Sequence, residues 1–466
     1  MKYDVVVIGA GPGGYVAAIR AAQLGARTAL VEKEYIGGTC LNVGCIPTKA
    51  LIKNVEILHE IDLGKKRGIK IDGEIKLDYA KAVKAKDKAC KQLVNGVSGL
   101  LASNGIDVIS GTARPKADHT IQITKQDGTT ENIEYKKLIL ANGSRPAFPP
   151  IPGIESEGIV TSTEMLAMTE LPKHLVIIGA GVIGCEFATI YSRYGVEITM
   201  IEMLPNAVDV LDDSISAAMN GILENQGVQL MTNTAVKSFK KNDDGSIDVI
   251  VEKNSGEQIT VNGDKVLVSI GRLPNTEGLD ELGLEMNGKF ISINDKLETS
   301  VPDVYAIGDV TGKKQLAHVA SDMGTIAAEN AMGADHIMSY DIIPSCIYTI
   351  PEVASVGLSE QEAKENGIEY VTGNFPLVGC GKAVATGVAD GNFKIIADAK
   401  TKKILGAHLV GHGATEIIAE IAAYMKMEAT VDDVISTIHS HPTISESVAE
   451  AARDVYGITI HMPKKN

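Results

Sequence analysis

The chain has 466 residues, with 44 Lys and Arg against 59 Asp and Glu, so its formal net charge at pH 7 is −15. This length exceeds what one compact core holds, so several domains are expected. The acidic balance disfavours nucleic acid or an anionic membrane surface as partners, and no apolar run reaches the length of a transmembrane helix. Six cysteines are too few for a disulfide framework, and no basic leader precedes the first apolar run, so we expect a cytoplasmic protein without membrane insertion.

The first predicted unit is a strand, a glycine turn, a helix and a second strand. Residues 3–8 are apolar and β-branched, and the second strand ends at Glu32. Between them, Gly9 would make the tight turn, Gly11 would let backbone approach a pyrophosphate, and Gly14 would let the helix pack against the sheet. The helix N-terminus would bind phosphate, and Glu32 would accept hydrogen bonds from a ribose. The pattern predicts a dinucleotide site.

Two cysteines, Cys40 and Cys45, follow this unit five positions apart. A regular helix turns by about 100° per residue, so positions five apart do not share a face, and a bridge between them needs a distorted turn. Gly44 and Pro47 would supply the distortion. A strained local disulfide is easily reduced, and a helix N-terminus favours a thiolate. On spacing alone, a redox pair, a structural bridge, a metal site and two unrelated thiols all stay open.

The next predicted elements complete the first part of the chain. A long helical pattern runs from Asp78 to Ala102. Residues 138–145 indicate a strand that ends in a turn of small residues, and the proline-rich stretch 145–152 indicates a boundary.

The strand–glycine–helix–strand–acid pattern then occurs a second time. Residues 175–178 lead into Gly179, Gly181 and Gly184, and the following strand ends at Glu202 with the same spacing as in the first copy. Two dinucleotide sites in one chain imply two dinucleotides that exchange electrons. A carboxylate at Glu202 would accept bonds from a 2′-hydroxyl and repel a 2′-phosphate, which favours NAD over NADP.

The remaining elements change character towards the C-terminus. An antiparallel pattern with Asp-Gly and Asn-Gly turns ends the second unit, and residues 304–309 read as a strand that ends in a carboxylate suited to a ribose or ribityl hydroxyl. From residue 340 on, the pattern predicts strands around 345–357 and 392–409 and helices over 414–428 and 445–453.

Taken together, these motifs resemble the pyridine nucleotide–disulfide oxidoreductases, and among them most closely the dihydrolipoamide dehydrogenases. The resemblance covers essentially the whole chain. Its motifs, in the family's order, are the two glycine fingerprints and the segments 38–49, 269–275, 306–309, 316–318 and 439–446. One small departure is Asn142, where many relatives have Thr.

The resemblance implies an α/β fold with two Rossmann-like dinucleotide-binding domains, for FAD and NAD, and a C-terminal α+β dimerisation domain. The expected division is a first FAD-binding part over 1–145, an NAD-binding domain over 146–271, a return to the FAD-binding or central domain over 272–340, and an interface domain over 341–466.

The resemblance also implies roles for single residues. Cys40 would exchange with substrate, and Cys45 would be the thiolate that faces the flavin, deeper in the helix. Lys49 would lie near the flavin ring and pair with Glu186. The other residues implied to bind FAD or NAD are Gly9, Gly11, Gly14, Glu32, Lys33, Gly38, Thr39, Gly111, Asn142, Gly143, Ser144, Asp309, Ala317, Gly179, Gly181, Gly184, Glu202, Gly271 and Arg272.

His441 and Glu446 are the expected acid–base pair. Disulfide exchange needs a group that titrates near neutrality, and His441 would serve with Glu446 stabilising its charged form. In the family this histidine comes from the second subunit of a homodimer. His439 raises a zinc alternative, but two histidines with no cysteine or acid cluster nearby make a poor zinc site, so no metal is expected.

The expected function is oxidation of dihydrolipoyl groups, carried by lipoyl-bearing E2 core or glycine-cleavage H proteins, with transfer of electrons through FAD to NAD. The absence of C-terminal cysteines argues against mercuric reductases and large thioredoxin reductases. A glutathione-reductase-like NADPH disulfide reductase and a non-catalytic flavoprotein assembly subunit remain as alternatives.

Overall fold

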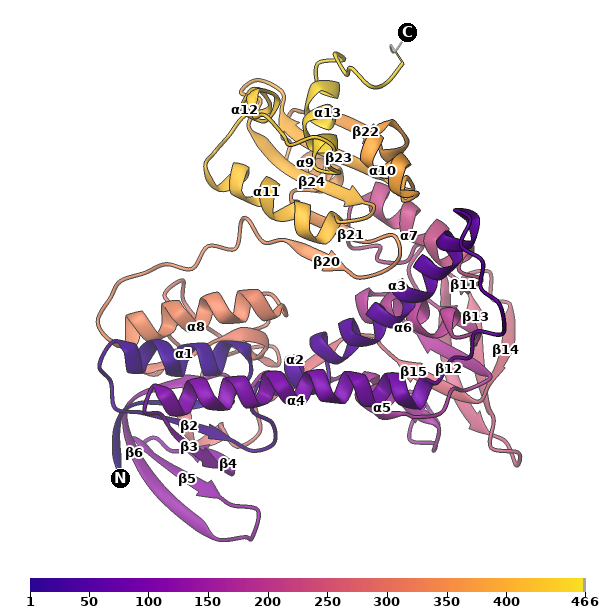
Figure 1. The fold of residues 1–466 in the computed structure, drawn as a ribbon. Coiled ribbons are helices and arrows are strands. Elements are labelled where there is room, and N and C mark those ends of the chain that lie inside the picture. The colour runs from indigo at the N-terminus through magenta and orange to yellow at the C-terminus, as the bar shows by residue number, and fades with distance from the viewer. Residues whose placement is uncertain (464–466) are drawn as a thin grey trace.

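A seven-stranded sheet organises the N-terminal part of the computed structural model, which describes residues 1–463 (Figure 1). Its order is β3-β2-β1-β6-β5-β4, with β19 paired to β6. The strands are β1 (Lys2–Ile8), β2 (Thr28–Glu32), β3 (Asp107–Ser110), β4 (Thr112–Pro115), β5 (Thr120–Thr124), β6 (Thr130–Leu140) and β19 (Val304–Ala306). The central strands run parallel and are almost continuously apolar because helices or loops cover both faces of the sheet.

Five helices belong to this part of the chain. They are α1 (Pro12–Gln23), α2 (Gly38–Asn42), α3 (Cys45–Lys66), α4 (Tyr79–Ser103) and α8 (Ala317–Ala331). Helices α1 and α8 lie side by side, and α4 runs from the first sheet towards the second (Figure 1). Asp78 caps α4 by accepting from the Lys81 N–H, so the helix predicted from Asp78 to Ala102 is confirmed with its end one residue later.

A second parallel sheet has the order β11-β10-β9-β15-β8. Its strands are β8 (Ile159–Val160), β9 (His174–Ile178), β10 (Glu197–Ile201), β11 (Gln229–Met231) and β15 (Lys265–Val268), and its helices are α5 (Ser162–Ala167), α6 (Val182–Arg193) and α7 (Asp213–Asn225). The predicted antiparallel stretch is confirmed as a separate sheet of β12 (Thr234–Lys241), β13 (Ile247–Lys253) and β14 (Gln258–Gly263).

The C-terminal part is an antiparallel sheet with helices packed around it. The order β20-β21-β24-β23-β22 joins β20 (Ser345–Ile347), β21 (Val353–Gly357), β22 (Tyr370–Pro376), β23 (Asn392–Asp398) and β24 (Ile404–Val410). The helices are α9 (Glu360–Glu365), α10 (Gly381–Thr386), α11 (Ala414–Lys426), α12 (Val431–Ser436) and α13 (Glu446–Asp454). The two predicted C-terminal helices are confirmed within two residues at each end.

Seven short elements complete the described structure. They are β7 (Ser144–Pro146), β16 (Arg272–Pro274), β17 (Met286–Asn287), β18 (Phe290–Ile291), and the 3₁₀ turns η1 (Asp280–Leu282), η2 (Gly308–Thr311) and η3 (Leu377–Gly379). One apolar cluster joins all three bodies, since it includes Leu51 of α3, Tyr191 of α6 and Ile347 of β20. The predicted fold class, two parallel nucleotide-binding sheets and a C-terminal α+β domain, is confirmed. Within residues 1–463, none of the helices combines the length and apolarity needed to cross a bilayer.

Candidate redox and cofactor site

The two cysteines stand on either side of a break between two helices. Cys40 lies within α2, and Cys45 is the first residue of α3. A Cβ at Gly44 would lie 2.9 Å from the Thr39 carbonyl oxygen, so only glycine lets the chain turn this tightly. Pro47 lies in the first turn of α3, where its missing N–H costs no intrahelical bond. The predicted distortion is therefore present at Gly44, but the prediction that Pro47 contributes to it is wrong.

The cysteines have opposite electrostatic environments. Both are free thiols, and Cys45 begins α3, whereas the expectation placed it deeper in the helix. A hydrogen bond from the Cys40 thiol lowers the pKa of Cys45 to about 7; burial opposes this, and the charge of Lys49 supports it. The same bond, with burial, raises the pKa of Cys40. Cys45 therefore ionises around neutral pH, whereas Cys40 keeps its proton.

A buried ion pair lies one helical turn beyond Cys45. The Lys49 Nζ lies 2.9 Å from each carboxylate oxygen of Glu186, whose side chain is 5% exposed. The backbone N–H of Tyr348 donates to the same carboxylate at 3.1 Å, and the Lys49 ammonium lies 4.5 Å from the centre of the Tyr348 ring. The structure therefore brings Lys49 and Glu186 together, as expected, and adds a tyrosine from the C-terminal part.

The first glycine fingerprint forms a close-packed cradle with one open position. A Cβ at Gly9 would lie 2.3 Å from the Ala141 carbonyl oxygen, and one at Gly14 would lie 1.8 Å from the Gly9 carbonyl oxygen. Gly38 packs so tightly that a Cβ there would lie 2.6 Å from the Cα of Gly11, whereas a Cβ at Gly11 would meet no atom within 4 Å. The cradle places the start of α2 against the first glycine loop and leaves space at the N-terminus of α1, which fits a pyrophosphate.

Glu32 supports this cradle through its carboxylate. It accepts hydrogen bonds from the N–H groups of Ala10 at 2.6 Å and Glu34 at 2.7 Å, which leaves further lone pairs for ribose hydroxyls. Gly111 donates its N–H to the Glu32 carbonyl oxygen, and a side chain there would clash with the Thr124 carbonyl oxygen at 2.7 Å. Lys33 is exposed next to Glu32.

Residues far apart in sequence form a polar cluster beside the cradle. The Ser144 hydroxyl donates to Asp309 at 2.5 Å, and the Arg272 Nε donates to the same hydroxyl at 2.6 Å. The Oδ1 atom of Asn142 is buried and has no hydrogen-bond partner among the described residues. Arg272 also interacts electrostatically with Cys45. A buried acceptor, a carboxylate and a guanidinium next to an open helix N-terminus fit the donor and acceptor groups of FAD.

The structure also places four other implied residues. Gly143 and Gly271 have φ of +66° and +122°, a region that favours glycine, and a Cβ at either would meet no atom within 4 Å. Ala317 is the first residue of α8, and Thr39 lies within α2.

The second fingerprint repeats the first cradle. A Cβ at Gly179 would lie 2.7 Å from the Ser269 carbonyl oxygen, and one at Gly184 would lie 2.1 Å from that of Gly179, while Gly181 is open. The Glu202 carboxylate accepts the N–H groups of Ala180 and Leu204, each at 2.8 Å. This acid therefore holds the turn as Glu32 does and keeps a negative charge at the ribose position, which fits NAD.

His441 and Glu446 form a dyad in the C-terminal part. The His441 Nδ1 lies 2.9 Å from Glu446 Oε1, and Glu446 Oε2 accepts the Thr443 N–H at 2.8 Å. Burial acts to raise the pKa of Glu446, but the bonds from Thr443 and His441 outweigh it and lower the pKa. Helix α13, which begins at Glu446, stands well away from α2 in Figure 1. Within one chain, the structure does not bring this dyad to Cys40.

His439 makes its own contacts next to the dyad. Its Nε2 lies 2.8 Å from Glu420, and its Nδ1 lies 3.0 Å from the Thr437 carbonyl oxygen. Its side chain is 8% exposed, so the ring is held between two protein partners.

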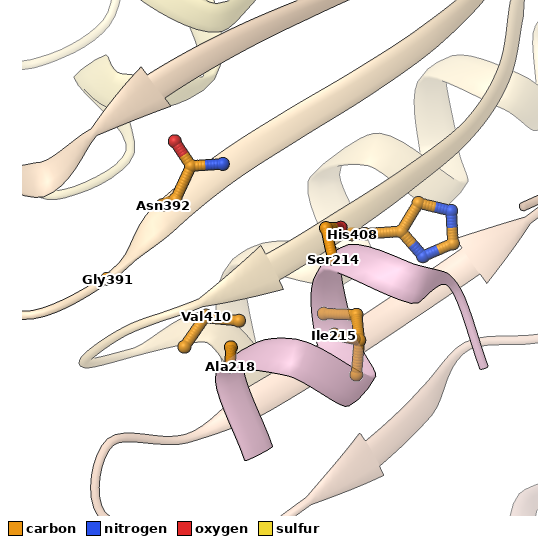
Figure 2. A pocket seen from close by; sticks show the side chains of 7 residues that line it. All are labelled: Ser214, Ile215, Ala218, Gly391, Asn392, His408 and Val410. Atoms are coloured by element: carbon orange, nitrogen blue, oxygen red, sulfur yellow. The ribbon is translucent and has the colours of Figure 1, made fainter. Parts of the chain in front are cut away.

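A partly open pocket of about 120 Å³ lies elsewhere, between α7 and the strands β23 and β24 (Figure 2). Its lining comprises Ser214, Ile215, Ala218, Gly391, Asn392, His408 and Val410. None of the candidate residues lines it, and sites for drug-sized ligands hold about 300–1,000 Å³. The cavity is therefore distinct from both nucleotide cradles.

Sequence reasoning missed Tyr348 and Thr443. Tyr348 contacts Glu186 across 162 positions of sequence, and no local spacing signals such a contact. Thr443 lies within the segment 439–446, but only the folded turn shows that its N–H holds the Glu446 carboxylate.

Comparison with known proteins agrees with this geometry. Residues 3–324 match the family described as pyridine nucleotide-disulphide oxidoreductase, and residues 343–452 match the dimerisation domain of that family, which supports a homodimer. The chain is 42% identical over 459 residues to the mitochondrial dihydrolipoyl dehydrogenase of Bos taurus, covering 96% of this chain and 89% of that one. It is 41% identical over 476 residues to the dihydrolipoyl dehydrogenase of Bacillus subtilis, covering 99% of each.

Solved structures give the same assignment. LpdA from Mycobacterium tuberculosis matches with a TM-score of 0.88 at 27% identity, over 97% of this chain and 99% of that one. The HOCl-induced flavoprotein disulfide reductase RclA from Escherichia coli, in its Cu(II) complex, matches with a TM-score of 0.87 at 28% identity, over 97% and 99%. With two glycine-fingerprint cradles and family matches along nearly its whole length, the chain belongs to the pyridine nucleotide–disulfide oxidoreductase family.

Proposed function

We propose that this protein oxidises dihydrolipoyl groups to lipoyl disulfides and passes the electrons through the Cys40–Cys45 pair and FAD to NAD. The observation that carries the proposal is the asymmetric thiol pair at the start of α3, in a chain that is 41–42% identical to dihydrolipoyl dehydrogenases over nearly its whole length. The activity, the cofactors and the family are consistent with one another.

The exchange step follows from the thiol geometry. In the oxidised pair, a substrate thiolate attacks the Cys40 sulfur, the Cys40–Cys45 bond breaks, and Cys45 leaves as a thiolate. The second substrate thiolate then attacks the substrate sulfur bound to Cys40, which closes the lipoyl disulfide and releases Cys40. Two electrons have moved from the substrate to the pair. Cys45 is the better leaving group because its pKa is lowered to about 7, and a thiol of low pKa leaves faster.

The chain's own residues hold the cofactors. Bound FAD would supply the two-electron chemistry that links the dithiol to NAD, including hydride transfer. The cradle of Gly9, Gly11 and Gly14 with Glu32 would bind its adenine dinucleotide part, and the Ser144–Arg272–Asp309 cluster would support it. The second cradle of Gly179, Gly181 and Gly184 with Glu202 would bind NAD.

The proton of the attacking substrate thiol has to pass to a separate base. We assign this to His441 with Glu446 of the second subunit, since the dyad is far from α2 within one chain (Figure 1). A neutral imidazole takes the proton from a substrate thiol and returns it in the reverse reaction. This assignment makes the homodimer necessary for activity.

The biological setting is part of the proposal. Lipoyl groups on an E2 core subunit or a glycine-cleavage H protein are the proposed substrates.

We keep the division of the chain at 1–145, 146–271, 272–340 and 341–466, which the pairing of β19 with β6 supports. Six cysteines in 466 residues are too few for a disulfide framework, which supports a reducing compartment such as the cytoplasm.

One pair of assays tests the proposal. The purified protein with FAD should reduce NAD when supplied with dihydrolipoamide. The matched assay is reduction of glutathione disulfide by NADPH, which should be far slower. Fast glutathione reduction without dihydrolipoamide oxidation would favour the glutathione-reductase-like alternative, and inactivity in both assays would favour a non-catalytic flavoprotein.

A further inference from the structure

Tyr348 directly follows β20 and touches both members of the Lys49–Glu186 pair. Its backbone N–H donates to Glu186 at 3.1 Å, and its ring centre lies 4.5 Å from the Lys49 ammonium. Three segments from different parts of the chain, α3, α6 and the end of β20, therefore meet at one ion pair.

We propose that Tyr348 is a positioning residue of the redox site, whose ring holds the Lys49 ammonium in place beside the Cys45 thiolate and whose N–H fixes the Glu186 carboxylate. The proposal rests on the proposed function for the use of this thiolate. The geometry that it invokes belongs entirely to this chain.

The electrostatic effect of Lys49 on the pKa of Cys45 depends on the position of the Lys49 ammonium. The groups that face Cys45 are the Cys40 thiol of α2, Lys49 of its own helix, Glu186 of α6 and Arg272 of β16. The Cys40 hydrogen bond lowers the Cys45 pKa most, Lys49 lowers it further, and Glu186 raises it. The net effect of the ion pair is thus a difference between two opposing charges, and a small displacement of either one changes it.

Lys49 needs an additional contact to stay in this position. Its side chain is 31% exposed, whereas that of Glu186 is 5% exposed, so the ammonium can move towards water and the carboxylate cannot. The face of an aromatic ring attracts a cation that lies within about 6 Å of its centre. The Tyr348 ring at 4.5 Å therefore opposes movement of Lys49 away from the thiolate.

The ring, and not the hydroxyl, carries this role. Burial raises the pKa of Tyr348 to about 12, so the hydroxyl remains neutral at working pH. Phenylalanine keeps the aromatic face, leucine removes it, and both keep the backbone N–H that binds Glu186. Comparison of Tyr348→Phe with Tyr348→Leu therefore isolates the face of the ring.

The test uses the FAD-bound protein, reduced anaerobically with one equivalent of dithionite. The long-wavelength absorbance expected of a thiolate next to a flavin is followed against pH, which titrates Cys45 without any lipoyl substrate. A protein that fails to oxidise dihydrolipoamide would still give this titration, so failure of the proposed function can be told apart from failure of the proposed role of Tyr348. FAD content and Tm are measured for each variant, and Tyr348→Met replaces Tyr348→Leu if the latter loses FAD.

The midpoint of Tyr348→Leu should rise by about 0.5 to 1 pH unit, which is about a three- to tenfold smaller thiolate-to-thiol ratio at a given pH. Tyr348→Phe should titrate as the parent does. A matched control is Tyr456→Leu, which removes a ring 6.0 Å from the ammonium of Lys402, away from the redox pair, and should change nothing.

A double-mutant comparison decides whether Tyr348 acts through Lys49. In the Lys49→Met background, Tyr348→Leu should cause no further shift. The proposal is overturned if Tyr348→Leu titrates like the parent, if Tyr348→Phe shifts as far as Tyr348→Leu, or if the Tyr348→Leu shift persists in full without Lys49.

Discussion

Replacement of Lys394 by methionine should weaken the junction between the second parallel sheet and the C-terminal sheet. The Lys394 Nζ lies 2.9 and 3.1 Å from the two carboxylate oxygens of Asp212, the N-cap of α7, and also contacts Glu360. The side chain of Asp212 is fully buried, and that of Lys394 is 5% exposed. Loss of one partner from a buried ion pair leaves an uncompensated charge, which costs about 3–5 kcal/mol of unfolding free energy.

The other hydrogen-bond donors to Asp212 decide where the expected loss of unfolding free energy falls between about 3 and 5 kcal/mol. Its carboxylate still accepts the N–H and hydroxyl of Ser214 and the N–H of Glu360 after the substitution. Because these donors remain, we expect the lower end, about 3 kcal/mol. The double variant Asp212→Asn with Lys394→Met should recover part of the loss, since it removes the fully buried charge of Asp212 and leaves only the partly exposed Glu360 carboxylate without Lys394.

The pH dependence has a definite sign. Burial raises the pKa of Asp212, but the charge of His408 and the hydrogen bonds to its carboxylate outweigh it, so the folded-state pKa is lowered below 3.8. A carboxyl with a depressed folded pKa contributes stability above its unfolded pKa and loses it as the pH falls through the folded value. Without Lys394, the folded pKa rises, so the acid-induced loss of stability should begin at a higher pH.

Urea unfolding of the FAD-bound protein, followed by circular dichroism, measures both effects, since the chain has no tryptophan. Lys400→Met is the matched control, because Lys400 is 81% exposed and its pair with Glu369 lies on the surface. The control should unfold at the parent's urea concentration. If Lys394→Met unfolds together with the control, the reasoning from the buried pair is refuted.

Three further predictions concern the redox chemistry. Cys45→Ser should abolish the long-wavelength absorbance of the reduced protein and nearly all lipoamide turnover while FAD stays bound. In the unmodified protein, this absorbance should fade only as the pH falls to about 7 or below, because protonation removes the Cys45 thiolate. NAD should be used far more efficiently than NADP, and neutral substitution of Glu202 should narrow the preference; a purified protein that prefers NADP would contradict our view of this acid. His441→Gln should lower lipoamide turnover by roughly 10² to 10⁴, with little effect on electron transfer from NADH to an artificial acceptor, and Glu446→Gln should cause a smaller loss. Mixing inactive Cys45→Ser and His441→Gln dimers should restore activity by subunit exchange, and no recovery after verified exchange would mean that each site is built from one chain.

The sequence by itself determined the features that depend on neighbouring residues. The spacing of Gly9, Gly11 and Gly14, repeated at 179–184, predicts two strand–turn–helix units, because the first and last glycine of each copy meet backbone of the same unit or of a neighbouring strand end and the middle glycine stays open. Helix α4 and its cap at Asp78 were predictable from local pattern for the same reason. Local reasoning was wrong where a position within a helix decided the outcome, since Pro47 in the first turn of α3 breaks no hydrogen bond.

Only the tertiary structure decided how distant groups share charge. Lys49 and Glu186 are 137 positions apart, Ser144 and Asp309 are 165 apart, and Lys394 and Asp212 are 182 apart. The family resemblance suggested the first of these pairs, but no periodicity in the chain encodes a contact between separate sheets. The ionisation of Cys45 depends on such contacts, because Coulomb interactions follow distance in space and burial, and both arise only when the three bodies pack together.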